Sequence, residues 1–520
     1  MNKNFLNYAI KTVSACLLLF LLFLPMAGSA AELSIESKSE NEPMNHIVFL
    51  PQITRAFPWS GNPFGFESER SISNASLTQK AIELHPGWAR LNGRISWRDL
   101  QPQENGPIQW NLLADFEKEL GILKAQHIQP IIVVDDYPRW ATIVPNSCSP
   151  LLESKFGAFA SFMEALVDRY STPGFNVYNW ELGNEVDVDR RLVETDSHYG
   201  CWGNIDDLTF YGGDYYGKMV KVVGAAIKQR NPAATVWLGG LMIATPLTTN
   251  PDLGKPENFL RGILAVGAAP SFDYVSYHGH QSWYGSRIDP VVEYAGGAWA
   301  PYQGDKSRFI RQILQEYGVT KRLFLTEAGV GCPEWNAKCV APPLEFFQFQ
   351  ADQGIRSIVR VVNSGNDGFV WYQMPGPSWR YSSLLNGSYE PQPIYTAYKQ
   401  LISQTWMSEP VGQVSYGTGL DAYEFRKGNT RIDVVWTNQD VTIPINIPAN
   451  EFIKAYDRNG AVITPFPSGF NFVLTASFSP IYVIRGPAFQ SVSAVWPNAQ
   501  EVGAQEVALF RKDFFSQTQP

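Results

Sequence analysis

Two glutamates are placed where they could act as a catalytic pair: Glu185 in YNWELGNEVD at 178–187 and Glu327 in RLFLTEAG at 322–329. Each follows a short run of apolar, aromatic and β-branched residues, which is typical of a buried strand. Two carboxyl groups can cleave an acetal when one donates its proton to the leaving oxygen and the other, ionised, attacks the carbon. Burial, a like charge or a nearby cation can divide identical side chains in this way.

Polar residues beside the two glutamates could support that chemistry. Asn184 precedes Glu185, and its amide can both donate to and accept from a hydroxyl group. Arg90, in GWARLNGR, is the nearest candidate cation. Glu181 lies about 13 Å deeper along the strand than Glu185, at about 3.3 Å per residue. We therefore expect Glu181 to form a buried salt bridge, with Arg90 as a candidate partner.

The elements that must position these residues alternate along the chain. Helical patterns such as LLADFEKELGILKAQH and SKFGAFASFMEALVDRY separate short apolar runs at 48–53, 87–94, 128–136, 176–185, 234–241, 272–280, 322–329 and 367–374. This alternation over residues 45–400 predicts an α/β fold, a (β/α)8 TIM barrel. The alternative is a doubly wound open sheet, but no glycine-rich phosphate-binding pattern follows the first run.

In a parallel barrel the chemistry takes place at the C-terminal ends of the strands, where the loops leave the face open. Glu185 would end the fourth strand and Glu327 the seventh. These strands lie on opposite sides of the barrel mouth, so we expect the two carboxyl groups to converge there. Asp135 and Asp136 end the third strand, and either reach the same cleft or cap the following turn.

The pattern changes near residue 405. Between VGQVSYGTG and SPIYVIRG, short strands recur between turns, and no amphipathic helix interrupts them. This predicts a small antiparallel β-sandwich domain. The expected organisation is a signal peptide at 1–31, a catalytic barrel at 32–404, a β-sandwich accessory domain at 405–487 and a tail at 488–520.

The first thirty-one residues have the pattern of a secretory signal peptide. Lys3 and Lys11 precede the apolar run CLLLFLLFLP, and the small residues AGSAA follow at 27–31. Cleavage is expected near Ala30 or Ala31, and an uncleaved anchor is the alternative. No later segment approaches about eighteen continuous apolar residues. We therefore expect a mature protein without membrane insertion, secreted to the periplasm or the extracellular medium.

Four cysteines remain after cleavage: Cys148, Cys201, Cys332 and Cys339. An even number in an exported chain indicates disulfide bonds. Three pairings are possible, and we favour Cys332–Cys339, which are close in sequence, and therefore Cys148–Cys201. A zinc site is the rival interpretation, but CPEWNAKC lacks a Cys-x-x-Cys spacing and no histidine is adjacent to a cysteine.

Charge and missing motifs exclude several function classes. The net charge is −8 and no run of Lys or Arg is present, so a nucleic acid is not an expected partner. The sequence contains neither H-E-x-x-H nor G-x-S-x-G, the motifs of zinc proteases and serine hydrolases. We therefore expect no metal and no cofactor.

Several motifs together resemble a known group. The pattern W-E-x-x-N-E at 180–185 is similar to the fourth-strand signature of clan A glycoside hydrolases, in which the acid/base glutamate follows an asparagine. Similar motifs are LFLTEAG (nucleophile strand), SYHGH at 276–280, FVWYQM, PRWA at 138–141 and WRDLQPQENGPIQWN at 97–111. Over residues 45–486 the chain most resembles glycoside hydrolase family 39, with its barrel followed by a β-sandwich.

The resemblance implies a retaining glycoside hydrolase with Glu185 as acid/base and Glu327 as nucleophile, their carboxyl groups about 5–5.5 Å apart. It also implies that Asn184 binds the hydroxyl next to the anomeric carbon, that Arg90 supports the nucleophile and that His278 lines the pocket. A carbohydrate-binding pseudoenzyme, or a transglycosylase with the same site, is the alternative.

Aromatic residues are expected to bind the sugar, because the C–H faces of sugars pack on aromatic rings. The resemblance implies that Trp371 on the eighth strand faces the sugar, and Trp140 and Trp283 lie in loops after the third and sixth strands. His280, two residues beyond His278, is interpreted as a core histidine. Long loops after the strands favour an open groove that binds a polysaccharide or oligosaccharide. Nothing in the sequence indicates an oligomeric state. Further loop aromatics are Trp202, Tyr284 and Trp379.

Overall fold

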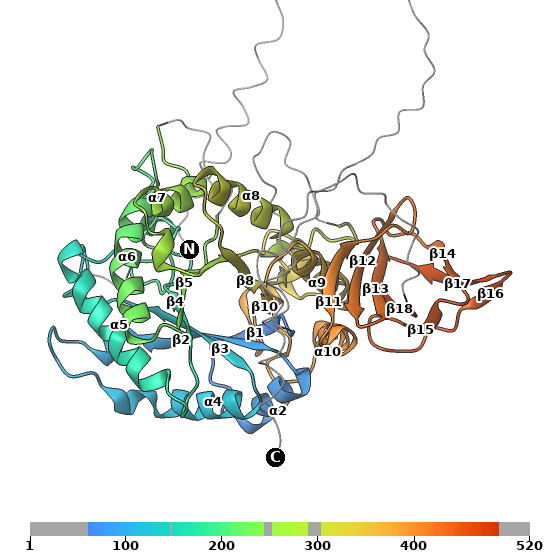
Figure 1. The fold of residues 1–520 in the computed structure, drawn as a ribbon, viewed down its shortest axis with the longest axis horizontal. Coiled ribbons are helices and arrows are strands. Elements are labelled where there is room, and N and C mark those ends of the chain that lie inside the picture. Colours follow the sequence, from blue (N-terminus) through green and yellow to red (C-terminus); the bar gives the residue numbers. More distant parts are fainter. Residues whose placement is uncertain (1–60, 146–147, 244–251, 290–302, 488–520) are drawn as a thin grey trace, which may run out of the picture. The chain divides into compact units, whose positions relative to one another are not determined.

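The computed structural model describes residues 61–145, 148–243, 252–289 and 303–487, arranged as in Figure 1. The expected signal peptide at 1–31, the apolar run at 48–53 and the expected tail at 488–520 lie outside these ranges.

A closed barrel of eight parallel strands confirms the predicted fold class. Strand β10 pairs with β1, with Phe64 opposite Phe369, and this pairing closes the barrel. The strands follow one another around the barrel in chain order, as expected for repeated strand–helix units. They are β1 (Phe64–Ser68), β2 (Trp88–Ser96), β3 (Gln129–Asp135), β4 (Asn179–Leu182), β5 (Thr235–Leu238), β6 (Tyr274–His278), β8 (Arg322–Ala328) and β10 (Phe369–Trp371).

The prediction was wrong for the first strand of the barrel. It is Phe64–Ser68, with the sequence FGFES, and not the apolar run at 48–53. A Cβ atom on residue 65 would lie 2.8 Å from the carbonyl oxygen of Trp88, so the close approach of β2 requires glycine at this position. Its glutamate, Glu67, is completely buried. Because this short strand contains a glycine and a glutamate, it does not form a continuous apolar run and was not predicted as a strand.

Helices pack around the outside of the barrel, between successive strands (Figure 1). The first of them, α2, begins after Asn74, whose side chain accepts hydrogen bonds from the N–H groups of Ser76 and Leu77. Among the described residues, no helix is both long and apolar enough to cross a bilayer. The helices are α2 (Ala75–Leu84), α3 (Trp97–Leu100), α4 (Ala114–Ala125), α5 (Phe156–Tyr170), α6 (Gly213–Arg230), α7 (Phe259–Ala265), α8 (Gln303–Glu316), α9 (Leu344–Asn363) and α10 (Pro393–Thr405).

Large aromatic side chains fill the barrel interior toward the N-terminal ends of its strands. Trp237 stacks on Tyr274 with ring centroids 3.9 Å apart, and Trp88 and Phe324 pack against Trp237. Residues two positions further along a strand point into the barrel one layer higher. On β2 that residue is Arg90, so a polar layer lies directly above the aromatic one. Among the described residues, this aromatic layer fills the barrel interior beneath the polar one.

The C-terminal strands form the predicted antiparallel β-sandwich. Apolar residues of both sheets, including Val435, Val483, Ile445 and Leu474, form its core. One sheet has the order β11 (Glu409–Gln413), β12 (Leu420–Lys427), β13 (Thr430–Thr437), β18 (Ile481–Arg485), β15 (Phe452–Tyr456), and the other β14 (Ile443–Pro448), β17 (Asn471–Ala476), β16 (Phe466–Ser468).

Polar contacts join the sandwich to helix α9 of the barrel. Arg458 of the sandwich forms an ion pair with Asp352 of α9, and both side chains are buried. Arg356 of α9 donates to the carbonyl oxygen of Phe478 at 3.3 Å, and its guanidinium lies 4.0 Å from the centroid of that ring. The junction is thus a desolvated polar interface rather than a loose contact.

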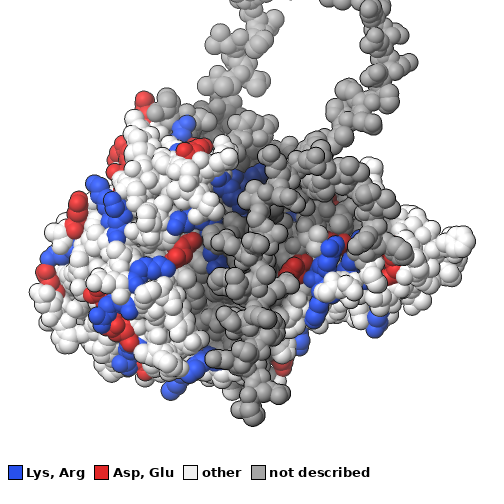
Figure 2. Space-filling model, viewed as in Figure 1, with Lys and Arg blue, Asp and Glu red and all other residues white. Residues whose placement is uncertain are grey.

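Acidic and basic side chains are interspersed on the face shown in Figure 2. Over the described residues of that face, no continuous basic area of the kind that binds a nucleic acid backbone is visible.

Candidate active site

Glu185 is held over the barrel mouth by the turn that follows β4. Gly183 has φ +94° and Glu185 itself has φ +50°, a left-handed conformation that is uncommon for glutamate. A Cβ atom on residue 183 would lie 2.5 Å from Cγ1 of Val186, so glycine is required there. Such strained residues cluster at functional sites, where the surrounding structure holds them in place.

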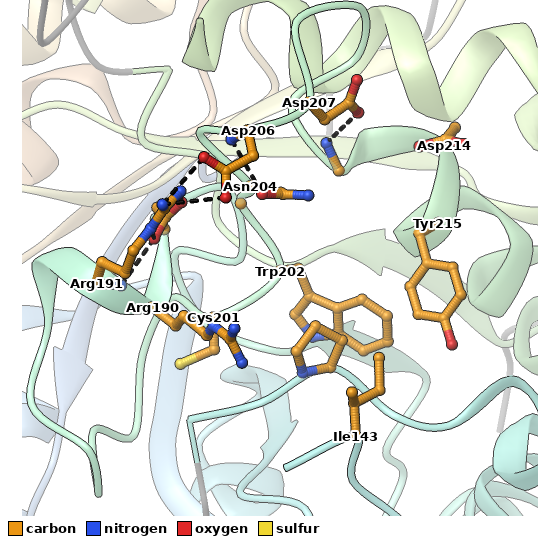
Figure 3. Close-up of a pocket in the computed structure, with 14 residues that line it drawn as sticks. Ile143, Arg190, Arg191, Cys201, Trp202, Asn204, Asp206, Asp207, Asp214 and Tyr215 are labelled. Atoms are coloured by element: carbon orange, nitrogen blue, oxygen red, sulfur yellow. Dashed lines mark hydrogen bonds and ion pairs between the residues drawn. The ribbon is translucent and has the colours of Figure 1, made fainter. Parts of the chain in front are cut away.

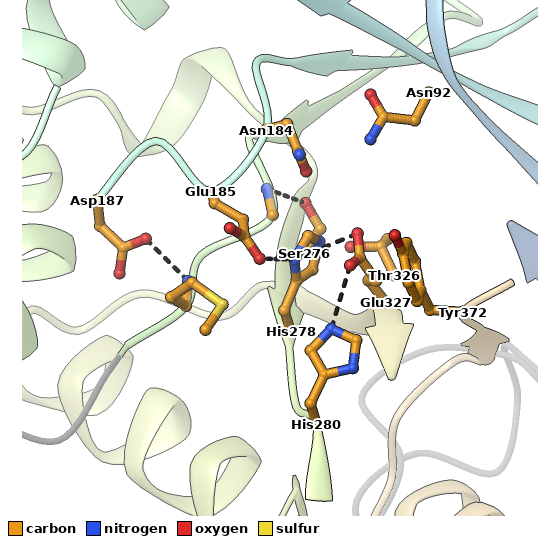
Figure 4. A network of polar contacts seen from close by, with 12 residues as sticks. Asn92, Asn184, Glu185, Asp187, Ser276, His278, His280, Thr326, Glu327 and Tyr372 are labelled. Atoms are coloured by element: carbon orange, nitrogen blue, oxygen red, sulfur yellow. Dashed lines mark hydrogen bonds and ion pairs between the residues drawn. The ribbon is translucent and has the colours of Figure 1, made fainter. Parts of the chain in front are cut away.

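Glu327 projects from β8 toward the same space as Glu185 (Figure 4). A carboxylate oxygen of each glutamate and a ring nitrogen of His280 all lie within 4.8 Å of one another. The side chains of Glu185 and Glu327 are 15% and 8% exposed. The structure therefore brings together the two glutamates that the sequence analysis paired.

Arg90 is the centre of the polar layer beneath this pair. Its Nη1 donates to Glu327 at 3.0 Å and to Glu67 at 2.7 Å, and its Nε donates to Glu181 at 2.7 Å. Its Nη2 donates to the side-chain oxygen of Asn184 at 2.8 Å. The predicted salt bridge between Arg90 and Glu181 is present. A single buried cation thus orients three carboxyl groups and the asparagine.

Two histidines stand beside the glutamates. Nδ1 of His278 lies 3.1 Å from Glu185 Oε1 and 3.6 Å from Glu327 Oε2, and Nε2 of His280 lies 3.1 Å from Glu327 Oε1. Burial lowers the pKa of His280 to about 4 and lowers the pKa of His278 well below its ordinary value. Both imidazoles are therefore neutral at neutral pH. His280, interpreted from the sequence as a core residue, belongs to the site.

The environment of the pair favours one shared proton. Burial raises the pKa of Glu185. Burial raises the pKa of Glu327 to about 8; Arg90 opposes that rise, and the charge of Glu185 adds to it. Two carboxyl groups this close do not both ionise readily. When the pair holds one proton, the direct hydrogen bond from Arg90 at 3.0 Å favours the ionised form of Glu327, whereas Glu185 contacts neutral His278.

The same three atoms could also bind a metal ion, because one oxygen of Glu185, one oxygen of Glu327 and a ring nitrogen of His280 lie close together. Arg90 already supplies a positive charge to Glu327 at 3.0 Å. The guanidinium would repel a metal ion bound there, so the arrangement fits two carboxyl groups acting as a pair better than it fits a metal site.

The glutamates line a cleft of about 270 Å³. Tyr199, Tyr372 and Trp379 form its aromatic wall, and the hydroxyl of Tyr372 donates to Glu69 at 2.8 Å. Sequence reasoning missed Glu69 together with Glu67, because it misplaced β1. Glu67 and Glu69 are two residues apart, and this spacing could have indicated that both point inward, since alternate residues along a barrel strand do so. The cleft is lined by Glu69, Asn92, Asn184, Glu185, Tyr199, Met242, His280, Glu327, Tyr372 and Trp379.

The structure contradicts the expectation that Trp371 faces a sugar. Its side chain is completely buried, and its indole N–H donates to the carbonyl oxygen of Ser382 at 2.6 Å. Addition of a Cβ to Gly354 of helix α9 would bring it within 2.8 Å of the Trp371 ring, so the ring points outward to the helix layer. Side chains alternate along a strand, and the cleft-facing residue is Tyr372, one position later.

The two loop tryptophans chosen from the sequence do not line the cleft either. Trp283 is completely buried and packs against Phe346, so its ring is not available to a sugar. Trp140 is partly buried, packs edge-on against Trp97 and donates to the carbonyl oxygen of Gln101 at 3.3 Å. Trp283 thus packs its loop against helix α9, and Trp140 packs the loop after β3 against helix α3.

Asp187 and Lys306 hold the segment after β5 next to the pair. Asp187 accepts hydrogen bonds from the N–H groups of Met242 at 2.8 Å and Ile243 at 2.7 Å. The buried ammonium of Lys306 donates to the carbonyl oxygens of Met242 at 2.6 Å and His278 at 2.9 Å. These contacts fix cleft-lining Met242 and the backbone of His278.

Asp135 and Asp136 lie outside this cleft lining. Asp136 accepts a hydrogen bond from Ser96 at 2.6 Å and pairs with Arg98 at 2.8 Å, so it fastens the turn after β3. Asp135 is buried, and burial raises its pKa to about 8, with Asp136 adding to the rise. Asp135 is therefore protonated at neutral pH.

Both predicted disulfide bonds are present, Cys148–Cys201 and Cys332–Cys339. The first joins the loops after β3 and β4, and the second closes a loop after β8. All four cysteines lie at the C-terminal end of the barrel strands, where the first bond ties two loops together and the second closes one loop.

A larger cavity, of about 500 Å³, lies beside the first disulfide (Figure 3). Three of its carboxylates have partners: Asp189 bonds Arg191 and the N–H of Ile205, Asp206 pairs with Arg191, and Asp207 accepts from the N–H of Gly212 at 2.8 Å. The smaller cleft is the one in which Glu185 and Glu327 approach each other.

No protein-family model and no curated protein matches the sequence. Solved structures match its fold. A family 39 glycoside hydrolase from the gut symbiont Bacteroides cellulosilyticus WH2 has a TM-score of 0.60 at 17% identity, covering 82% of this chain and 81% of its own. The chain has the fold of family 39 glycoside hydrolases.

Two further structures share this fold. A family 39 β-xylosidase from Caulobacter crescentus has a TM-score of 0.54 at 14% identity, covering 84% of this chain and 98% of its own. A family 30 xylanase from Clostridium acetobutylicum has a TM-score of 0.54 at 13% identity, covering 82% of this chain and 96% of its own. At these identities the similarity establishes the fold, and the chemistry depends on the site itself.

Proposed function

We propose that the protein is a retaining glycoside hydrolase that cleaves O-glycosidic bonds of a polysaccharide or oligosaccharide. The observation that carries the proposal is the pair Glu185 and Glu327, whose carboxylate oxygens approach within 4.8 Å at the mouth of the barrel. Retaining glycosidases have their two carboxyl groups about 5–5.5 Å apart, whereas inverting enzymes need about 6.5–9.5 Å to admit a water molecule.

In the first step Glu327 attacks the anomeric carbon and the bond from that carbon to the leaving oxygen breaks. Glu185 gives its proton to the leaving oxygen, and a glycosyl ester forms on Glu327. The contact between Arg90 and Glu327 orients the nucleophile and favours its ionised form. Glu185, whose pKa is raised by burial, holds the proton that this step requires.

In the second step Glu185, now ionised, takes a proton from a water molecule. The water oxygen attacks the same carbon, and Glu327 leaves as a carboxylate. Asn184 supports both steps: its side-chain oxygen accepts from Arg90 at 2.8 Å, which directs its NH2 group away from the arginine and toward a sugar hydroxyl.

The comparisons support a glycan as the substrate, since the structures of similar fold include a xylanase and a β-xylosidase. Xylan is therefore the first polysaccharide to test. The two disulfides support action outside the cytoplasm, where such bonds persist, and the N-terminal signal pattern agrees with this location.

Purified protein should release oligosaccharides from at least one member of a panel of xylan, mannan, β-glucan and acidic polysaccharides, detected by mass spectrometry. Glu327→Ala should lower kcat at least about 10³-fold, and Glu185→Ala about 10²- to 10⁴-fold. Asp168→Ala, an exposed residue far from the cleft, is the matched control and should leave the rate unchanged. Equal rates for the parent and Glu327→Ala would show that the barrel only binds carbohydrate.

A further inference from the structure

Two exposed aromatic rings on the catalytic face have no part in the proposed mechanism. Trp335 lies in the loop closed by Cys332–Cys339, and Tyr284 lies in the loop after β7 (Gln281–Ser282). Their side chains are 61% and 64% exposed. The ring centroids are 5.4 Å apart with an angle of 41° between the planes, so the rings form one continuous aromatic surface.

The two loops are fastened to each other. The side chain of Asn336 donates to the carbonyl oxygen of Trp283 at 3.3 Å, and Lys338 donates to the carbonyl oxygen of Gly285 at 2.9 Å. Strand β7 also pairs with β9 (Val330–Gly331), just before the disulfide-closed loop. Because the backbone on both sides is held, the rings lose little conformational freedom when a ligand binds.

The same loop is bonded to the wall of the cleft. The N–H of Cys332 donates to the carbonyl oxygen of Arg380 at 2.8 Å. The guanidinium of Arg380 lies 4.2 Å from the centroid of Trp379, which lines the cleft. The aromatic surface and the cleft are thus parts of one connected set of loops at the barrel mouth.

We propose that Trp335 and Tyr284 form an outer sugar-binding platform, on which a sugar ring of the glycan packs while another part of the chain occupies the cleft. This proposal rests on the proposed function and extends it to a substrate longer than the cleft alone can hold. Sugars suit the surface because their C–H faces pack on aromatic rings. Glu334, exposed beside Trp335, can accept a hydrogen bond from a hydroxyl group at the edge of the ring.

Binding is tested with the full chain carrying Glu327→Ala, which cannot turn over, by electrophoresis through gels that contain xylan, mannan, β-glucan or an acidic polysaccharide. In the gel that retards this protein, adding Trp335→Ala and Tyr284→Ala should weaken retardation about 3- to 10-fold. The matched control is Phe470→Ala, because Phe470 is 94% exposed on the sandwich. It should leave retardation unchanged.

A second measurement uses the active protein. Trp335→Ala with Tyr284→Ala should raise KM for the polysaccharide about 3- to 10-fold and leave hydrolysis of a short oligosaccharide unchanged. Equal retardation with and without the two rings, or no retardation in any gel, overturns the platform. Loss on short and long substrates alike also overturns it. If Glu327→Ala keeps full activity, the proposed function fails instead, and the two failures are therefore distinguishable.

Discussion

At the scale of single residues, the site depends on one arginine that faces three carboxyl groups. Arg90 carries one positive charge, whereas Glu67, Glu181 and Glu327 would carry three negative charges if all were ionised. Burial raises the pKa of Glu67 well above its ordinary value, although Arg90 opposes the rise, and the charge of Glu327 adds to it. A protonated Glu67 can donate a hydrogen bond to Glu327 and so favour the ionised form of Glu327.

We expect Glu67→Gln to keep activity within about 10-fold of the parent, because glutamine is also neutral and also donates. Glu67→Ala removes the donor and should cost about 10²-fold or more in kcat/KM. The discriminating measurement is the pH profile of kcat/KM. Its acidic limb should be unchanged in Glu67→Gln. A shift of that limb to lower pH by about one unit would show that Glu67 carries a negative charge beside Glu327, contrary to this account.

Asp135 predicts a pH dependence of stability. Burial raises its folded-state pKa to about 8, whereas an unfolded aspartic acid ionises near its ordinary value of 3.8. Between these two pH values unfolding releases a proton, so the free energy of unfolding falls as the pH rises, by at most about 1.4 kcal/mol per pH unit. Asp135→Asn does not titrate. Its Tm should fall less than that of the parent between pH 5 and pH 8, and parallel Tm curves would contradict the assignment.

At the scale of elements, repeated patterns in the sequence predicted most of the barrel. Seven of the barrel strands and the pair Glu185 and Glu327 could be placed because apolar runs end in polar residues at the barrel mouth. Strand β1 could not be placed, because Gly65 and Glu67 interrupt its apolar pattern for reasons of packing and charge. Which aromatic ring faces the cleft depends on strand register, and a difference of one residue separates buried Trp371 from cleft-lining Tyr372.

The two disulfides should differ in their contribution to stability. Cys148 and Cys201 are separated by 53 residues and Cys332 and Cys339 by 7, so the first bond restricts the unfolded chain more. The loop-entropy relation gives about 4 kcal/mol for the longer loop and about 2.5 kcal/mol for the shorter. Paired Cys→Ser variants, compared by guanidinium unfolding, should lose stability in that order. The reverse order would mean that local structure outweighs chain entropy.

At the scale of the whole molecule, the barrel and the sandwich share buried polar contacts. Arg458 pairs with Asp352, and Arg360 of helix α9 pairs with Asp421 of β12. Removing one partner of a buried pair leaves a charge poorly compensated, which costs about 3–5 kcal/mol. The sandwich therefore stabilises the barrel wall that carries α9, rather than being an independent appendage.

The full chain should accordingly unfold in one calorimetric transition. Arg458→Ala should lower the free energy of unfolding by about 3 kcal/mol. The control is Arg230→Ala, which breaks an exposed pair with Asp168 and should cost no more than about 1 kcal/mol. Two resolved transitions in the parent protein, or equal losses in the two variants, would show that the domains unfold independently.

The central claim is that Glu185 and Glu327 act on one anomeric carbon by two successive displacements. The most direct measurement is the configuration of the first-formed product, followed by ¹H NMR immediately after the protein is mixed with a polysaccharide that it cleaves. Two displacements at the same carbon predict that the newly formed reducing end first appears with the configuration of the bond that was cleaved, and then mutarotates. A first product of the opposite configuration would contradict the account, because it requires water, and not Glu327, to attack the sugar.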